Sequence, residues 1–118
     1  MSHFAFLFSL SPDSGDKAER ALDTLEAALK CSHAAFVFLY EDGVHFARTD
    51  RDIPQGESDL VTRLHALLNL PSLECVACIT AAERRGVRDN NRHPAIRTAG
   101  LGEWTEQLNA ADRVVQFR

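Results

Sequence analysis

Three cysteines, Cys31, Cys75 and Cys78, are the strongest nucleophiles in the sequence. Cys78 follows an apolar run and precedes a short helical pattern, so we expect it at the end of a buried strand. Backbone N–H groups at a helix start favour a thiolate, as do nearby cationic side chains, here Arg84 or Arg85. A free cysteine at such a place can equally be a small buried apolar residue. Position alone therefore leaves both a reactive and a structural Cys78 open.

Cys75 and Cys78 form a Cys-x-x-Cys pair, the spacing of a thiol redox site. That chemistry needs both residues in the first turn of a helix, whereas Cys75 is predicted inside a strand. Residues three apart in a strand point to opposite faces, which disfavours a disulfide between them. Zinc would need two further ligands, and Cys31, His33 and His93 are scattered without a paired motif. We therefore expect no metal site.

Other polar and aromatic residues give weaker signals. His45 and His93 are expected on loops at the same rim as Cys78, and we favour solvated side chains there over ligand contacts. Cys31 follows the first helix at the opposite edge of the sheet, so a structural, slowly reacting thiol is expected. Trp104 is expected in packing or at a subunit contact. The sequence has no Gly-rich phosphate loop and no Gly-x-Ser-x-Gly elbow, so no cofactor is expected.

Strand-like and helix-like patterns alternate along the chain. Apolar runs predict strands over residues 4–10, 34–40, 73–79, 95–98 and 113–117. Helical patterns fall over residues 16–30, 60–68, 81–85 and 103–109. This order predicts one α/β domain over residues 1–118, with a mostly parallel five-stranded sheet flanked by helices in flavodoxin-like layering. Functional groups in such folds gather beyond the carboxyl ends of the strands, where Cys78 is expected.

Local signals predict where the elements begin and end. Asp16 and Glu19 resemble a capping box at the start of the first long helix. Ser58 is the expected cap of the second helix, and Pro71 ends it. Residues 44–57 are predicted to form a polar loop, because proline and glycine interrupt any regular element there.

Composition limits the classes of function. The chain has 118 residues, 45% of them hydrophobic and 25% charged, which is ordinary for a globular protein. The net charge of −4 does not indicate a nucleic-acid surface. No apolar run approaches the roughly 20 residues of a membrane helix, and the N-terminus lacks the features of a secretory signal. We expect a cytoplasmic protein with reduced thiols that binds neither membranes nor nucleic acid directly.

Three motifs, in order along the chain, closely resemble those of the DsrE/TusD proteins of the DsrE/DsrF-like family, which are small sulfur-relay subunits. The most specific is Cys78-Ile-Thr-Ala-Ala-Glu-Arg-Arg-Gly-Val87. Phe38-Leu-Tyr-Glu-Asp-Gly-Val44 is similar to a second motif of the family. Ile96-Arg-Thr-Ala-Gly-Leu-Gly102 and Ala111-Asp-Arg-Val-Val-Gln-Phe117 resemble its closing segments. Residues 88–95 form a shorter segment than in typical members, so the rim near the cysteine and the choice of partner are expected to differ.

The resemblance implies a sulfurtransferase with a central parallel sheet, in which Cys78 carries a persulfide. Arg84 and Arg85 would support its thiolate. The sulfur would come from a donor protein and pass to an acceptor protein, with no metal, nucleotide or acid–base pair required. The route would be either tRNA 2-thiouridine synthesis or dissimilatory sulfur oxidation. Relatives assemble with paralogous DsrE/F/H-like (TusB/C/D-like) subunits, so a hetero-oligomer or a homo-oligomer is expected.

Two alternatives to a sulfur carrier remain at this stage. The chain could be a non-catalytic structural subunit of the same kind of assembly, with an unreactive Cys78. It could also be a thiol redox protein that uses Cys75 and Cys78. The helical cover predicted for the sheet is thin, so part of its surface is expected to be closed by another subunit. Trp104, Leu108 and the apolar first strand are the candidates for such contacts.

Overall fold

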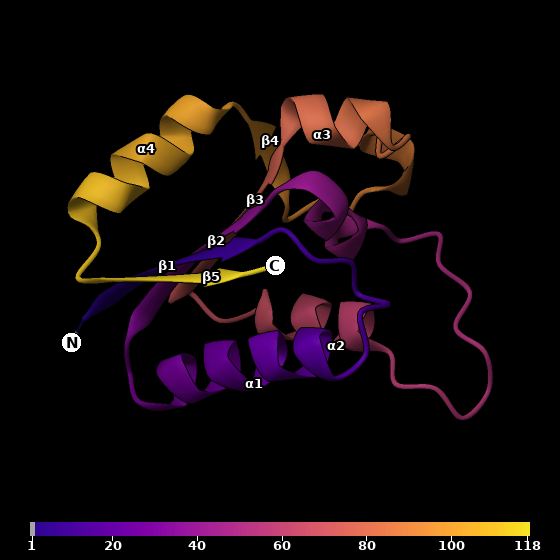
Figure 1. The fold of residues 1–118 in the computed structure, drawn as a ribbon, viewed down its shortest axis with the longest axis horizontal. Helices are drawn as coiled ribbons and strands as arrows, with labels where there is room; N and C mark the ends of the chain where they lie inside the picture. The colour runs from indigo at the N-terminus through magenta and orange to yellow at the C-terminus, as the bar shows by residue number, and fades with distance from the viewer. Residues whose placement is uncertain (1) are drawn as a thin grey trace.

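The computed structural model describes residues 2–118 and confirms the alternation of strands and helices (Figure 1). The strands are β1 (His3–Phe8), β2 (Ala34–Leu39), β3 (Leu73–Cys78), β4 (Arg97–Ala99) and β5 (Arg113–Phe117). The α-helices are α1 (Asp16–Lys30), α2 (Leu60–Leu67), α3 (Ile79–Arg84) and α4 (Leu101–Ala110). Two short 3-10 helices, η1 (Glu41–Ala47) and η2 (Asp89–Asn91), complete the described elements.

The five strands form one sheet in the order β4-β3-β2-β1-β5, and every neighbouring pair is parallel. The predicted parallel sheet is therefore confirmed. The chain moves outward from β1 to β4, and α4 then crosses back so that β5 pairs with the other side of β1. α1 and α2 cover one face of the sheet, and α3 and α4 cover the other (Figure 1). All the carboxyl ends of the strands consequently lie at one edge.

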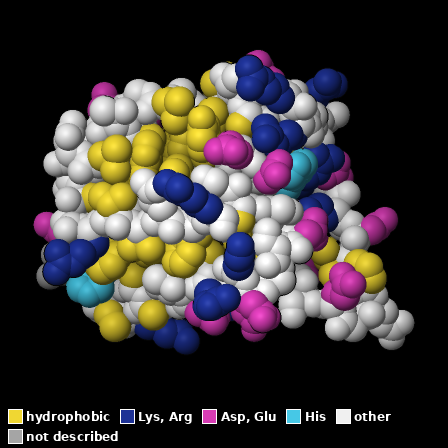
Figure 2. All heavy atoms as spheres, in the orientation of Figure 1, with side chains coloured by type: hydrophobic (Ala, Val, Ile, Leu, Met, Phe, Trp, Pro, Cys, Tyr) yellow, Lys and Arg dark blue, Asp and Glu magenta, His cyan; other side chains and the backbone are white. Residues whose placement is uncertain are grey.

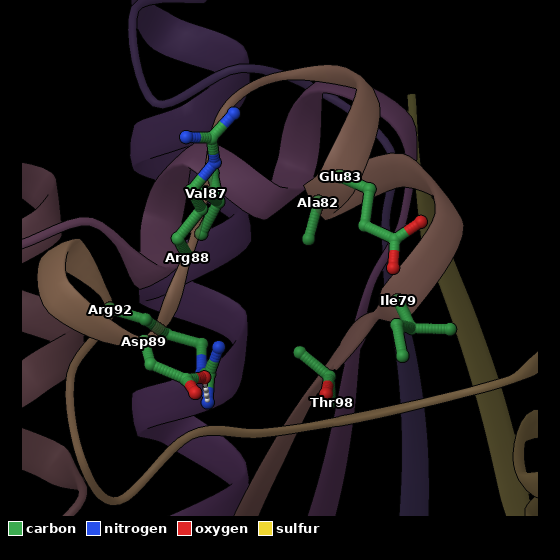
Figure 3. Close-up of a pocket in the computed structure, with 8 residues that line it drawn as sticks. All are labelled: Ile79, Ala82, Glu83, Val87, Arg88, Asp89, Arg92 and Thr98. Carbon is green, nitrogen blue, oxygen red and sulfur yellow. Dashed lines mark ion pairs between the residues drawn. The ribbon is translucent and has the colours of Figure 1, made fainter.

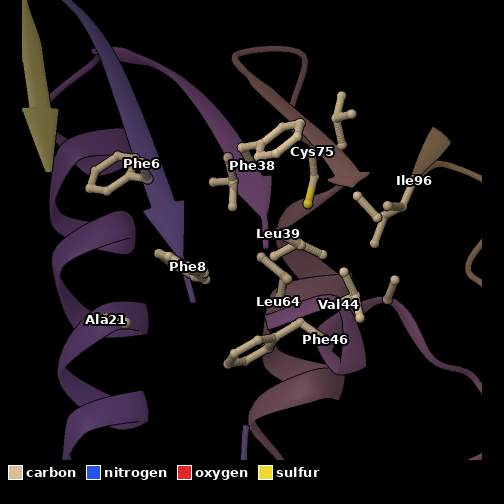
Figure 4. Packing of buried hydrophobic residues seen from close by; sticks show 14 of the residues in the cluster. Phe6, Phe8, Ala21, Phe38, Leu39, Val44, Phe46, Leu64, Cys75 and Ile96 are labelled. Atoms are coloured by element: carbon tan, nitrogen blue, oxygen red, sulfur yellow. The ribbon is translucent and has the colours of Figure 1, made fainter. Parts of the chain in front are cut away.

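The core on the α1–α2 face is built from aromatic and aliphatic side chains. Phe6 and Phe8 of β1 are fully buried, as are Leu22 and Leu25 of α1. Figure 4 shows Cys75 among the buried side chains of this cluster. Alternate residues of a strand face opposite sides, so the apolar run of β1 supplies side chains to both layers.

On the other face, α4 packs through Trp104, whose ring stacks on Phe38 of β2 at a centroid distance of 6.0 Å. Trp104 is 7% exposed. It is therefore a packing residue of this chain, as predicted, and a place near a subunit contact stays a prediction. Leu108 of α4 is exposed, as is Val114 of β5. Apolar side chains gather along α4 and on both sides of β5 in the surface view (Figure 2).

The expectation of a polar loop over residues 44–57 is wrong for its first part. η1 continues to Ala47, and Val44 and Phe46 are fully buried. An ideal Cβ on Gly43 would lie 1.8 Å from the carbonyl oxygen of Phe8, so only glycine allows this close approach. Two apolar residues in one 3-10 turn give too short a pattern for periodicity to reveal.

Two predicted helix caps are also wrong. Gly15, with φ of 61°, is the N-cap of α1, and Asp16 is its first residue, so no capping box forms. Asp59, not Ser58, caps α2, because its carboxylate accepts the N–H of Thr62 at 3.0 Å. Several adjacent residues at each helix start can act as caps, so the geometry of the turn decides which of them does. None of the helices formed by residues 2–118 combines the length and apolar character needed to cross a membrane.

Candidate functional site

Cys78 is the last residue of β3 and stands immediately before α3. It pairs in register with Ala99 of β4. Glu74, on the same face of β3 as Cys78, forms an ion pair with Arg97, which also contacts Glu103 of α4. Cys78 therefore projects toward the α3–α4 side of the sheet, and its side chain is 3% exposed.

The Cys78 side chain lines a cavity of about 420 Å³. The cavity forms at the carboxyl edge of the sheet, between the end of β2, α3 and the start of α4. Its other lining residues are Tyr40, Glu41, Thr80, Ala81, Arg84, Arg85, Gly100 and Leu101. Cys78 thus combines low exposure with a cavity into which a small sulfur-bearing group can enter.

The structure brings both predicted arginines to this cavity, in different states. Arg84 is exposed. Arg85 is 27% exposed, and its Nε donates to Asp42 Oδ1 at 2.9 Å while Nη1 donates to the carbonyl of Ala81 at 3.3 Å. The hydrogen bond and charge of Arg85 hold the pKa of Asp42 below its usual value. Sequence reasoning missed Asp42, although it lies in one of the motifs that carry the family resemblance.

Glu41 forms the boundary between the Cys78 cavity and a neighbouring cavity of about 460 Å³. Its φ of 49° lies in the left-handed region, which is uncommon for a residue with a side chain. Tyr40 lines both cavities too, and the second is completed by Leu7, Ser9, Gln116 and Arg118. Glu41 is thus a wall of the candidate site, and Asp42 and Gly43 follow it directly in η1.

The two other thiols lie in different surroundings. Cys75 is 2% exposed, and burial raises the pKa of its thiol far above the ordinary value. Cys75 and Cys78 are both free and project to opposite faces of β3, as the strand spacing predicts. Cys31 is exposed at the end of α1, so the expectation of a structural Cys31 is wrong. A helix end offers no sequence signal for which side of the turn its last residue faces.

Neither predicted rim histidine lines the cavity of Cys78. The ring of His93 packs on His65 of α2 at a centroid distance of 4.6 Å, and its backbone N–H donates to Ala47 O at 2.8 Å. His45 lies within η1, where burial lowers its pKa. Both side chains are half-buried, which differs from the solvated side chains that the sequence favoured.

A smaller cavity of about 230 Å³ lies on the opposite flank of α3 (Figure 3). Its lining includes Ile79 and Glu83 of α3, together with Arg88 and Arg92 from the segment after it. Arg92 forms an ion pair with Asp89 at 2.8 Å. Cys78 does not line this cavity, so the segment 88–95 forms a surface beside the site and not part of it.

Comparison with known protein families shows the family to which this chain belongs. The model of the DsrE/DsrF-like family matches residues 2–117. The chain belongs to the DsrE/DsrF-like family. It is 33% identical to a protein named DsrE from Allochromatium vinosum, over 97% of both chains. It is 36% identical to the sulfurtransferase TusD homolog of Pseudomonas aeruginosa, over 90% of both chains. The crystal structure of the ychN protein from E. coli has the same fold, with a TM-score of 0.82 at 16% identity, covering 99% of this chain and 100% of that one.

These findings confirm the family resemblance and the parallel α/β fold. They support the prediction of a sulfurtransferase that works in a sulfur relay with partner proteins, and they do not favour the alternative of a non-catalytic subunit.

Proposed function

We propose that Cys78 is the residue that carries sulfane sulfur, as a persulfide, between a donor protein and an acceptor protein. The observation that carries the proposal is the placement of the three thiols. Cys78 opens into a cavity at the carboxyl edge of the sheet. Cys75 is sealed in the core, and Cys31 is exposed at the end of α1, away from that edge.

The chemistry is a pair of exchanges at sulfur. The Cys78 thiolate attacks the outer sulfur of the donor's persulfide, the donor S–S bond breaks, and the donor leaves as a thiolate. Cys78 then holds an S–S⁻ group. A thiolate of the acceptor attacks the outer sulfur of that group, and Cys78 leaves as the thiolate. Each step exchanges one S–S bond for another, so no external oxidant or reductant is needed.

The shape of the site restricts how the donor reaches Cys78. A side chain that is 3% exposed cannot be attacked on a flat surface, so the donor sulfur must enter the cavity of about 420 Å³. That volume fits a few side chains of a projecting segment and not a folded domain. The site therefore favours donors and acceptors that present sulfur on a narrow segment.

The family relationship and the exposed surface together support a proposal for assembly and cellular role. Exposed apolar residues on α4 and β5, among them Leu101 at 48% and Val114 at 43%, support contact with paralogous subunits or with copies of this chain. We propose a cytoplasmic relay that serves either tRNA thiolation or sulfur oxidation. Both routes use the same thiol chemistry.

Transfer from a persulfidated donor protein, followed by mass spectrometry of peptides, tests the proposal. The wild type and Cys31→Ser should gain one sulfur atom on the peptide that contains Cys78, whereas Cys78→Ser should gain none. Cys31→Ser is the control for adventitious sulfur on an exposed thiol. Sulfur acceptance by Cys78→Ser at the wild-type level would contradict the proposal and favour a different carrier residue.

A further inference from the structure

Arg85 is held in the wall of the Cys78 cavity by two contacts. It is the C-cap residue of α3, and its guanidinium donates from Nε to Asp42 and from Nη1 to the carbonyl of Ala81. Its own carbonyl accepts Nη1 of Arg48 at 3.1 Å. A planar guanidinium held at two of its nitrogens has a defined orientation, whereas an unheld arginine side chain samples many rotamers.

Asp42 is a rigid anchor for that guanidinium. It lies in η1 between Glu41, whose φ is 49°, and Gly43, whose N–H donates to Tyr40 O at 2.8 Å. The close approach of Gly43 to Phe8 O fixes this turn against the end of β1. The backbone around Asp42 is therefore clamped even though its carboxylate is 62% exposed.

The charged residues that line the Cys78 cavity come from two segments. η1 contributes Glu41, which follows Tyr40 at the end of β2, and the end of α3 contributes Arg84 and Arg85. The ion pairs of Arg97 with Glu74 and Glu103 lie on the same face of the sheet but outside this lining, to which α4 and its N-cap contribute only Leu101 and Gly100. Arg84 is exposed, whereas Arg85 is held by Asp42 and by the Ala81 carbonyl, so Arg85 is the cation with a fixed place in the cavity wall.

We propose that Asp42 is a positioning residue for Cys78: it keeps the Arg85 guanidinium in the cavity wall, where the positive charge favours the thiolate and the persulfide anion. Asp42 does not line the cavity and acts through Arg85. Because Arg85 lowers the pKa of Asp42, the carboxylate is ionised at neutral pH and the pair persists. This inference rests on the proposed role of Cys78 as the sulfur-carrying residue.

The positioning role predicts the direction in which Cys78 reactivity changes when Asp42 is removed. If Asp42 acted through its charge alone, its removal would favour the Cys78 thiolate and speed alkylation, because a negative charge is lost. If Asp42 positions Arg85, its removal frees the guanidinium to move into water, and alkylation of Cys78 slows. The two roles predict changes of opposite sign.

The experiment measures the pH dependence of Cys78 alkylation by iodoacetamide in a Cys31→Ser background, with peptide mapping. Asp42→Asn should raise the pH midpoint by roughly half a unit and slow alkylation at neutral pH about threefold. Asp42→Glu should restore much of the wild-type midpoint. Asp23→Asn is the matched control, because Asp23 is 59% exposed and pairs with Arg63 at 2.6 Å on the other side of the sheet. It should leave the midpoint unchanged.

A second test uses an Arg85→Gln background, so that the conclusion does not depend on the Asp42→Asn variant alone. With Arg85→Gln present, no guanidinium remains to be positioned, so Asp42→Asn should now lower the midpoint. If Asp42→Asn does not fold by circular dichroism, Arg85→Lys takes its place, and a midpoint above the wild type is expected because lysine lacks the fork that Asp42 holds. A midpoint that falls or does not move in Asp42→Asn, or in its Arg85→Lys replacement, would overturn the inference. The assay uses no sulfur donor, so its failure is distinct from a failure of sulfur acceptance by Cys78.

Discussion

The two faces of the sheet differ in how completely helices cover them. On the α1–α2 face, Phe8, Leu22 and Leu25 have no exposed surface. On the α3–α4 face, α3 has six residues and α4 has ten, and the Cys78 cavity opens between them and the strands. Cys75 and Cys78 lie three positions apart on one strand, yet they belong to these two different environments.

Because of this difference, one strand places Cys75 in the stabilising core and Cys78 at a cavity where chemistry is possible. A continuous layer excludes water and raises the pKa of a thiol, as it does for Cys75. The other layer is broken because α4 must run from β4 at one edge of the sheet to β5 at the other. The gap left beside α3 is where Cys78, Tyr40 and Glu41 meet.

The largest loss of stability is expected at Gly43, where η1 packs against the end of β1. Gly43→Ala would place a Cβ 1.8 Å from Phe8 O, and the backbone of η1 would have to move. We expect a loss of about 4 kcal/mol or more in the free energy of unfolding. Gly102→Ala is the control, because an ideal Cβ there meets nothing within 4 Å and alanine favours a helix. Urea unfolding that shows equal stability for the two variants would contradict the close approach at Gly43.

A smaller loss is expected from a cavity in the sealed layer. Leu25→Ala should lower the free energy of unfolding by about 3 kcal/mol, because Leu25 is fully buried and its surroundings relax only in part. Leu108→Ala, on α4 of the open face, removes a side chain that is 37% exposed and should cost less than about 1 kcal/mol. Similar losses in urea unfolding would show that the two faces are equally well packed.

The sequence predicts only part of the contrast between the two faces. The apolar face of α1 and the run of β3 predict their elements well, because burial on one or both sides leaves a period in the residues. Cys78 could be singled out because the end of a parallel strand is visible as the end of an apolar run. The contact of Asp42 with Arg85 spans 43 positions and leaves no local pattern. The exposure of Cys31 and the contact of His93 with His65 also depend on tertiary packing.

The burial of Cys75 predicts a pH dependence of stability. The pKa of this thiol is raised in the folded state, so the folded protein holds the proton more tightly than the unfolded chain does. The stabilisation is complete below the pKa of an unfolded thiol, about 8.5, and decreases above it by about 1.4 kcal/mol per pH unit. Cys75→Ala should therefore be less stable than the wild type at pH 7 and should lose less stability between pH 8.5 and 10. Parallel decreases for both proteins in urea unfolding would argue that Cys75 is not sealed from water.

The smallest changes in the free energy of unfolding are expected at two helix N-caps, that of α2 on one face of the sheet and that of α3 on the other. Asp59 caps α2 on the sealed side, where its carboxylate accepts the Thr62 N–H, so Asp59→Ala should cost about 1 kcal/mol. Ser58→Ala, the neighbouring control, should change stability by less than about 0.5 kcal/mol. Cys78 occupies the N-cap position of α3 and makes no capping hydrogen bond there.

Serine is a favoured N-cap residue, so Cys78→Ser should match or exceed the wild type by a few tenths of a kcal/mol in thermal unfolding. The same variant should lose sulfur acceptance, because a hydroxyl is a poor nucleophile toward sulfur at neutral pH. Greater stability together with lost transfer would show that the open face keeps a cysteine for its chemistry at a position where serine serves the fold better. A loss above about 2 kcal/mol would instead mean that the Cys78 sulfur is needed for packing, as the Cys75 sulfur is.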